Sequence, residues 1–202
     1  MAKQKSVAIR ESILEAATKV FAKTGFYKAK ALEIANKANI AVGTIYNYFK
    51  NKDDILISIF NERIGELNRT LISALQGVDD PDQRLSIILS SSISAMKNDR
   101  EFAEVVTIEL RQSSKFFSST AISSVLEFLE IITDVIHDGQ KRGIYRSDVD
   151  ARVVAWTLLG SLENLLHIWV LSDRLPEVKH RYDISLEEGK ETVERVLRRG
   201  LH

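Results

Sequence analysis

The chain of 202 residues contains few residues that interrupt a helix, and this scarcity constrains its fold more than any other feature. It has 2 Pro and 9 Gly, while Ala, Leu, Ile, Glu, Lys and Arg fill long stretches between them. These residue types favour helices, whereas Pro and Gly end or weaken them. The hydrophobic fraction of 45% is enough for a buried core. The sequence therefore predicts an all-α protein of about nine helices.

Charge is unevenly distributed along the chain. Residues 1–50 carry nine Lys or Arg against three Asp or Glu, a net charge of +6, and because the whole chain has a formal net charge of +0, the rest carries −6. A basic segment joined to an acidic body is typical of a module that binds a polyanion such as DNA. A solvated basic face on an ordinary pair of helices explains the same asymmetry equally well.

Three further features bear on the cellular location. The chain has 0 Cys, which excludes a disulfide scaffold, a thiolate zinc site and a Cys nucleophile. Glu11 and Glu15 follow the basic N-terminal residues, so no secretory signal is expected and a cytoplasmic protein is predicted. The apolar segment Val153 to Ser172 has the length of a membrane span. Polar residues interrupt it, and we expect a helix buried on nearly all sides and no contact with a membrane.

The first part of the chain predicts three helices. Apolar residues at helical spacing indicate a helix from about Val7 to Thr24, with a stop at Gly25. A shorter helix covers residues 32–38 and ends at Asn39, a residue type that tolerates the left-handed conformation of a tight turn. A third short helix is expected from about Ala41 to Phe49.

Capping signals predict six more helices in the rest of the chain. The fourth helix runs from Asn51 or Lys52 to near Gly77, the fifth from Asp80 with Pro81 to before Asp99, and the sixth from Asp99 to near Gln112. The seventh runs from Ser114 or Ser119 to Gly143, the eighth from Asp148 or Asp150 to before Pro176, and the ninth from Ser185 with Glu188 to Arg199. We expect two domains, covering residues 1–51 and 52–202.

Two short helices that follow a longer one inside the basic segment predict a helix-turn-helix from Leu32 to Phe49. In its second helix Ile45 and Phe49 lie one turn apart and are expected to face the core, which turns Gly43 and Asn47 outward. A Gly permits close approach of the backbone to DNA, and an Asn amide matches the major-groove edge of adenine.

Other polar residues of this segment suit the DNA backbone. Thr44, Tyr46 and Lys52 have the hydrogen-bond donors that phosphate oxygens accept. For Tyr46 and Tyr48, a structural role as the cover of a small core is the alternative.

The residues of this segment, in their order, resemble the N-terminal signature of the TetR-family transcriptional regulators. The shared residues are Gly25-Phe26, Ile34-Ala35, Ala38-Asn39-Ile40, Gly43-Thr44-Ile45-Tyr46, Tyr48-Phe49 and Lys50-Asn51-Lys52 followed by Asp53-Asp54-Ile55-Leu56. The resemblance implies a homodimer in which the three-helix DNA-binding domain binds a palindromic double-stranded DNA operator. The larger helical domain would bind an effector and form the dimer.

The resemblance also implies roles for individual residues. Base or groove contacts fall on Lys30, Val42, Gly43 and Asn47, and phosphate contacts on Thr44, Tyr46, Tyr48 and Lys52. Three positions depart from the family pattern. Asn39 stands for a common turn Gly, Ala41 for a common Ser cap and Lys30 for a common Thr, so the operator sequence does not carry over.

A narrower resemblance concerns the effector. Residues 43–59 and 109–113 are similar to the FadR-type repressors of fatty-acid degradation within the TetR family. This similarity implies a long-chain acyl-CoA as effector, with no cofactor. A repressor of an efflux or other operon that responds to a different hydrophobic small molecule is the alternative.

The body offers residues for such a ligand. The sixth predicted helix places the carboxylate of Glu109 on the same face as apolar side chains, where it needs a basic group or a ligand as partner. An ordinary ion pair between helices is the alternative, and apolar stripes are often plain core. The expected ligand-binding residues are Phe102, Val106, Glu109, Arg111, Phe116, Phe128, Trp156 and Leu159.

The last two predicted helices are expected to pair with those of a second subunit, as the family resemblance implies. The expected interface residues are Asn164, His167, Leu186, Val193, Val196 and Leu197. Asn164 and His167 suit a ligand pocket as well as a dimer contact.

Two other classes of protein are weighed against a regulator. An all-helical di-iron enzyme needs two Glu-x-x-His pairs, and only Glu177 to His180 has this spacing. No phosphate loop or nucleophile elbow is present, so the sequence predicts neither an enzyme nor a metal site. A helical adaptor that binds protein would differ from a regulator by lacking DNA binding that falls with added salt.

Overall fold

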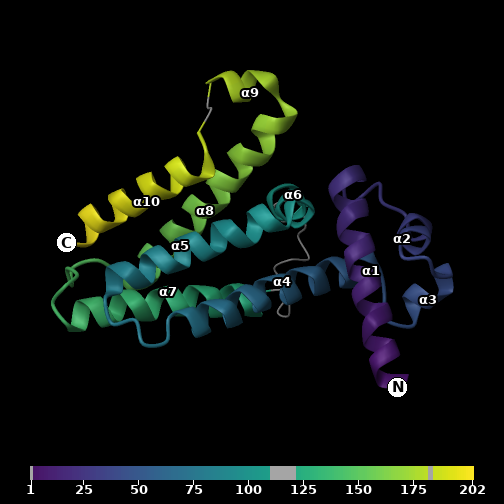
Figure 1. Ribbon diagram of the computed structural model, residues 1–202, viewed down its shortest axis with the longest axis horizontal. Helices are drawn as coiled ribbons and strands as arrows, with labels where there is room; N and C mark the ends of the chain where they lie inside the picture. The colour runs from purple at the N-terminus through teal and green to yellow at the C-terminus, as the bar shows by residue number, and fades with distance from the viewer. Residues whose placement is uncertain (1, 110–121, 182–183) are drawn as a thin grey trace. The chain divides into compact units, whose positions relative to one another are not determined.

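The computed structural model describes residues 2–109, 122–181 and 184–202, with side chains except at 2, 3, 108 and 109, and these residues form helices without any strand. Figure 1 shows the course of the helices along the chain. They are α1 (Ala2–Thr24), α2 (Ala31–Lys37), α3 (Val42–Tyr46), α4 (Lys52–Ala74), α5 (Pro81–Asn98), α6 (Arg100–Glu109), α7 (Ser123–Lys141), α8 (Ala151–Arg174), α9 (Pro176–Arg181) and α10 (Leu186–Leu201). The predicted all-α class is confirmed.

Several helices begin where local hydrogen bonding predicts. The Asp80 carboxylate accepts from the backbone N–H of Asp82 at the start of α5, and the Asp150 carboxylate accepts from the N–H of Arg152 at the start of α8. At α10 the Ser185 hydroxyl accepts from the N–H of Glu188, whose carboxylate accepts in return from the N–H of Ser185. These contacts confirm the predicted caps, because each satisfies an N–H that the helix itself leaves unpaired.

The turn between α2 and α3 depends on one left-handed residue. Asn39 has a φ of 54° and is the one residue other than Gly with a positive φ among the described residues. Asn adopts this conformation more readily than most residues because its short polar side chain can hydrogen-bond locally. Asn39 therefore does what the common turn Gly of the family does.

The helices differ from the prediction in three places. A short helix, α9, follows α8 after Leu175 and begins at Pro176, a residue that favours a first helical position. The sequence suggested only an end before this Pro. α3 is shorter than predicted, at Val42–Tyr46, and α7 begins at Ser123. The two starts proposed for α7, Ser114 and Ser119, lie outside the described residues.

The helices divide into two compact units. The first contains Met1–Arg63 and Arg100–Ile122, and the second contains Ile64–Asp99 and Ser123–His202. This division differs from a boundary after residue 51 because the first half of α4 belongs to the core of the first unit. There Ile55, Leu56 and Ile59 are buried, and the rings of Phe60 and Phe102 lie 5.6 Å apart.

In the second unit, α8 packs against α7 and α10, and α5 packs against α7, α8 and α10. The buried residues of α8 recur at helical spacing along one face: Ala151, Ala155, Leu158, Leu162, Leu166 and Val170. Val153 and Trp156 are 63% and 57% exposed. The prediction that α8 is buried on nearly all sides was wrong, because its apolar composition covers two faces and, among the described residues, one of them packs against other helices while Val153 and Trp156 stay exposed.

By length and composition, α8 is also the one described helix that could cross a membrane. Within its most apolar stretch of 18 residues, 28% is buried. Such a helix is weak evidence for a membrane protein, since helices that pack in proteins pass the same test.

A close contact joins α7 to the loop that follows it. The buried ring of Tyr145 lies against Gly139, and the Tyr145 hydroxyl donates to Asp82 Oδ1 at 2.8 Å. Burial and this hydrogen bond to a carboxylate raise the pKa of Tyr145. The neutral hydroxyl therefore helps to hold the end of α7 to the start of α5.

We expect Gly139→Ala to lower the free energy of unfolding by about 1 to 3 kcal/mol, because its methyl group would overlap the buried ring of Tyr145. Gly200→Ala is the matched control, since a Cβ at Gly200 meets no atom within 4 Å. The control should leave stability unchanged or raise it by up to about 1 kcal/mol. Urea unfolding measures both, and equal midpoints would contradict the proposed overlap.

Candidate functional site

The centre of the candidate site is α3, which is too short to be stable as an isolated helix. It spans Val42–Tyr46, and its inner side is held by the buried side chains of Ile45 and, just beyond its end, Phe49, which are 1% and 2% exposed. The neighbouring α2 contributes buried Ile34 and Ala35. The inward face predicted from helical spacing is confirmed.

The other side of this segment is open to solvent. Gly43 and Asn47 are exposed, and Tyr46 is 58% exposed. Asn47 is the C-cap residue of α3, so its amide lies at the end of the helix. The other residues predicted to contact DNA here are placed as follows: Val42, Thr44 and Tyr48 are half-buried, and Lys30 is exposed at the N-cap of α2. Their contacts with DNA stay a prediction.

Lys52 has a structural role that the sequence did not reveal. Its ammonium group donates to the backbone oxygens of Tyr27 and Ala29, at 3.1 and 3.0 Å, and lies 4.6 Å from the centre of the Phe26 ring. An ammonium has three donors, so two are used inside the chain. Lys52 therefore ties the start of α4 to the segment that joins α1 and α2.

Arg10 is a second residue whose role the sequence did not reveal. It pairs with Glu62 of α4, and its guanidinium carbon lies 5.3 Å from the centre of the Phe49 ring. The two side chains of the pair are 37% and 43% exposed, which limits what the pair contributes to stability. Its effect is geometric, because it links α1, the end of the helix-turn-helix and α4.

The residues expected to bind a ligand are spread over both compact units. Phe102 and Val106 are buried on α6 in the first unit. In the second unit Phe128 is buried on α7, and Leu159 is half-buried on α8. The side chain of Glu109 and the residues Arg111 and Phe116 lie outside the described part of the chain.

Trp156 of α8 is another of the residues expected to bind a ligand. It is 57% exposed, because it lies away from the face of α8 that packs against α7 and α10. Its contact with a ligand stays a prediction.

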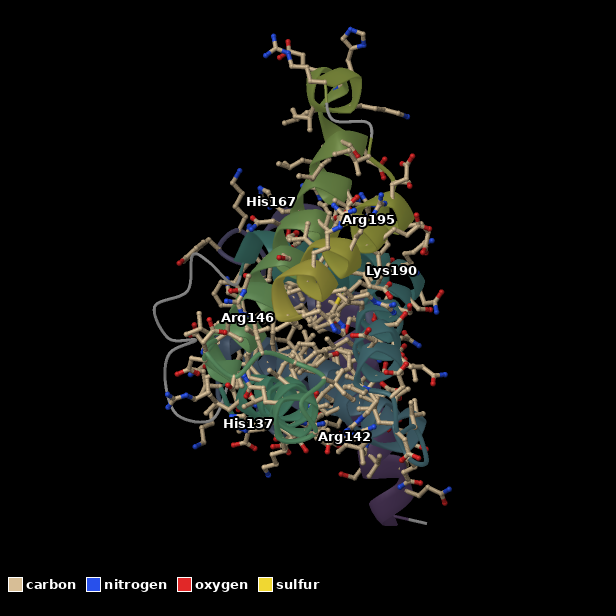
Figure 2. All side chains as sticks on the ribbon, turned by 90° about the vertical axis from the view of Figure 1, so that its left-hand side faces the viewer. His137, Arg142, Arg146, His167, Lys190 and Arg195 are labelled. Carbon is tan, nitrogen blue, oxygen red and sulfur yellow. The ribbon has the colours of Figure 1, made fainter. Side chains whose placement is uncertain are left out.

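Of the residues expected at a dimer interface, all except Leu186 are exposed or half-buried. Asn164 is exposed and His167 half-buried on α8, and Val196 is 65% exposed on α10, with Val193 and Leu197 half-buried. Figure 2 labels His167 on α8 and Arg195 on the neighbouring α10. Leu186 is 4% exposed in its own body, so it is core rather than available surface.

Comparison with known proteins identifies the family. The model described as "Bacterial regulatory proteins, tetR family" matches residues 13–59, and the model "YsiA-like protein, C-terminal region" matches residues 60–192. The chain belongs to the TetR family of regulators. This result confirms the resemblance seen in the helix-turn-helix.

Similar TetR-family proteins include regulators of fatty-acid metabolism. The chain is 30% identical to the fatty acid metabolism regulator protein of Bacillus subtilis over 162 residues. This alignment covers 80% of this chain and 84% of that protein. Its fold matches a crystal structure of FadR from Bacillus subtilis in complex with stearoyl-CoA, with a TM-score of 0.84, 28% identity, and coverage of 95% and 99%. FadR from Bacillus halodurans matches with a TM-score of 0.83 at 28% identity, again covering 95% and 99%. These relatives are transcriptional regulators rather than enzymes, and they confirm the FadR-type resemblance.

We expect Lys52→Met to lower the free energy of unfolding by about 1 to 3 kcal/mol, because two backbone oxygens lose their donor. Lys50→Met removes the same charge from an exposed position in the same segment and should leave stability nearly unchanged. Denaturant unfolding of the two variants measures the difference. Equal unfolding midpoints for the two variants would show that the ammonium of Lys52 does not stabilise the fold.

Proposed function

We propose that this TetR-family regulator is a homodimeric repressor that binds a palindromic operator in front of fatty-acid degradation genes and is released by a long-chain acyl-CoA. The observation that carries the effector assignment is the match over 95% of the chain to a FadR bound to stearoyl-CoA. A regulator that acts on DNA in a bacterium works in the cytoplasm, so this location follows from the proposal.

For operator binding, we assign base or groove contacts to Lys30, Val42, Gly43 and Asn47, and phosphate contacts to Thr44, Tyr46, Tyr48 and Lys52. Gly43 supports this assignment. It lies inside α3, and beyond its own helix backbone and chain neighbours a Cβ there would meet no atom of the described residues within 4 Å, so packing among them does not require a Gly. Close approach to DNA gives a reason for the missing side chain.

For dimer formation, we assign the exposed apolar positions of α8 and α10. Val153 and Trp156 on α8 and Val196 on α10 are all more than half exposed. Asn164, His167, Val193 and Leu197 complete the proposed interface. Large apolar side chains exposed on two packed helices are typical of surfaces that bind another protein.

For release from the operator, we assign to α4 the coupling between effector binding and DNA binding. This helix is continuous from Lys52 to Ala74 and contributes residues to both compact units. An effector changes DNA binding only if it binds two arrangements of the dimer with different affinity. A shift of the second half of α4 would reach the helix-turn-helix through Lys52 and through the pair of Arg10 and Glu62.

We expect Gly43→Ala to have opposite effects on stability and on DNA binding. Ala favours a helix by up to about 1 kcal/mol, so the unfolding midpoint should rise. The added methyl group should weaken operator binding by about tenfold, which corresponds to about 1.4 kcal/mol. Fluorescence anisotropy with a labelled operator duplex measures the affinity. Gly200→Ala is the control and should leave the affinity unchanged, and unchanged affinity in Gly43→Ala would contradict the groove assignment.

We expect palmitoyl-CoA to release the protein from an operator duplex as its concentration rises. The same titration with unrelated aromatic drugs should leave the complex intact. Anisotropy of the labelled duplex reports the bound fraction in each case. Release by the drugs but not by palmitoyl-CoA would contradict the acyl-CoA effector while leaving the DNA-binding role in place.

A further inference from the structure

The rotation of α10 about its own axis is fixed by its packing on the second compact unit. Leu186, Gly189 and Leu201 are buried on one side of the helix. A Cβ at Gly189 would overlap the side chain of Leu165 on α8, so the two helices approach closely there. A packed contact of this kind does not allow α10 to turn, and the side opposite these residues faces outward.

Ion pairs also tie both ends of α10 to α5. Near the start of α10, Glu187 Oε1 lies 3.4 Å from Lys97 Nζ. At its end, Asp82 Oδ2 lies 3.1 Å from His202 Nε2 and 3.9 Å from Arg198 Nη1. These charged side chains, which lie beside the packed side of the helix, therefore have partners within the chain.

Three charged side chains on the outward side differ from these. Glu191, Arg195 and Arg199 follow one another at intervals of four residues, so they lie along one side of α10. All three are exposed, and none of their side chains forms a hydrogen bond or an ion pair within the described part of the chain. Figure 2 labels Arg195 on α10. We call Glu191, Arg195 and Arg199 the charged stripe.

The helix dipole explains only one member of the charged stripe. Acidic residues stabilise the first turn of a helix and basic residues the last turn, and the effect falls off within about one turn. Arg199 lies in the last turn of α10, where the dipole favours it. Glu191 and Arg195 lie in the middle of the helix, so their charges need another explanation.

The charged stripe is complementary to itself when two copies of α10 run antiparallel. Around a two-fold axis near Val193, Glu191 faces Arg195 of the partner subunit, and the second contact repeats the first. A parallel pair of helices would place like charges opposite each other. Val196, which is 65% exposed on the same helix, adds an apolar contact beside these pairs.

We propose that Glu191 and Arg195 select a second copy of this chain as the dimer partner and fix the antiparallel order of the two α10 helices. This inference rests on the homodimer of the proposed function and adds what discriminates between partners. Apolar contacts accept many apolar surfaces, whereas a like charge opposite Glu191 or Arg195 disfavours association. A chain with similar apolar positions but another order of charges would therefore be rejected.

Charge-reversal variants of the full chain test this pairing. Glu191→Arg places two basic groups opposite each other in both contacts, and Arg195→Glu places two acidic groups there. We expect each variant alone to raise the dimer dissociation constant by about tenfold, measured by analytical ultracentrifugation. Glu130→Arg is the matched control, because it reverses the same charge at an exposed position of α7 and should leave the dissociation constant unchanged.

Mixing the two variants gives the sharper test, because each supplies the charges that the other lacks. We expect heterodimers in excess over random exchange, detected by native mass spectrometry with a mass tag on one variant. The excess should fall as salt is added, since salt screens exposed charges. Heterodimer formation also shows that both variants are folded. The double variant Glu191→Arg with Arg195→Glu keeps the complementarity and should dimerise like the wild type.

The outcomes separate this inference from the proposed function. If the wild-type chain is a dimer, both single variants match its dissociation constant and their mixture exchanges at random, the inference is overturned and the homodimer stands. The charged stripe is then a solvated face of α10. If the wild-type chain is a monomer in solution, both the homodimer and the inference are overturned.

Discussion

The fold of the DNA-binding part depends on the burial of Ile45 and Phe49. α3 has five residues and α2 has seven, and helices this short are not stable in water without tertiary contacts. Ile45 and Phe49 supply those contacts at the second helix of the motif, and Ile34 supplies them at the first. Since the inner side fixes how α3 is turned, Gly43 and Asn47 on its outer side have a defined orientation although they add nothing to the core.

The long helix α4 contributes residues to both compact units. Its first half is buried in the same unit as α3, and Lys52 and Glu62 each join it to other segments of that unit. Its second half, from Ile64 on, belongs to the other unit. One continuous helix therefore contains residues of both units, among them those that position the helix-turn-helix, which is a simple physical basis for the proposed coupling of effector binding to DNA binding.

The α8 helix shows the difference between apolar composition and burial. Its sequence is apolar on two faces, and we interpreted this as a helix surrounded by its own chain. In the structure one face packs against α7 and α10, and Val153 and Trp156 are exposed. The residue pattern could not separate an apolar face that packs inside the chain from an apolar face that stays exposed, because the two have the same composition.

The sequence by itself determined the features that depend on near neighbours. The helix starts at Asp80, Asp150 and Ser185 follow from hydrogen bonds within three residues, and the inward side of α3 follows from the helical repeat. Only the tertiary structure decided the rest. Lys52 finds carbonyl oxygens 25 and 23 residues away, Arg10 finds Glu62, and Asn68 finds Ser124 and Glu127 on α7. Such contacts have no local signature, because they arise from the packing of helices that are distant in the chain.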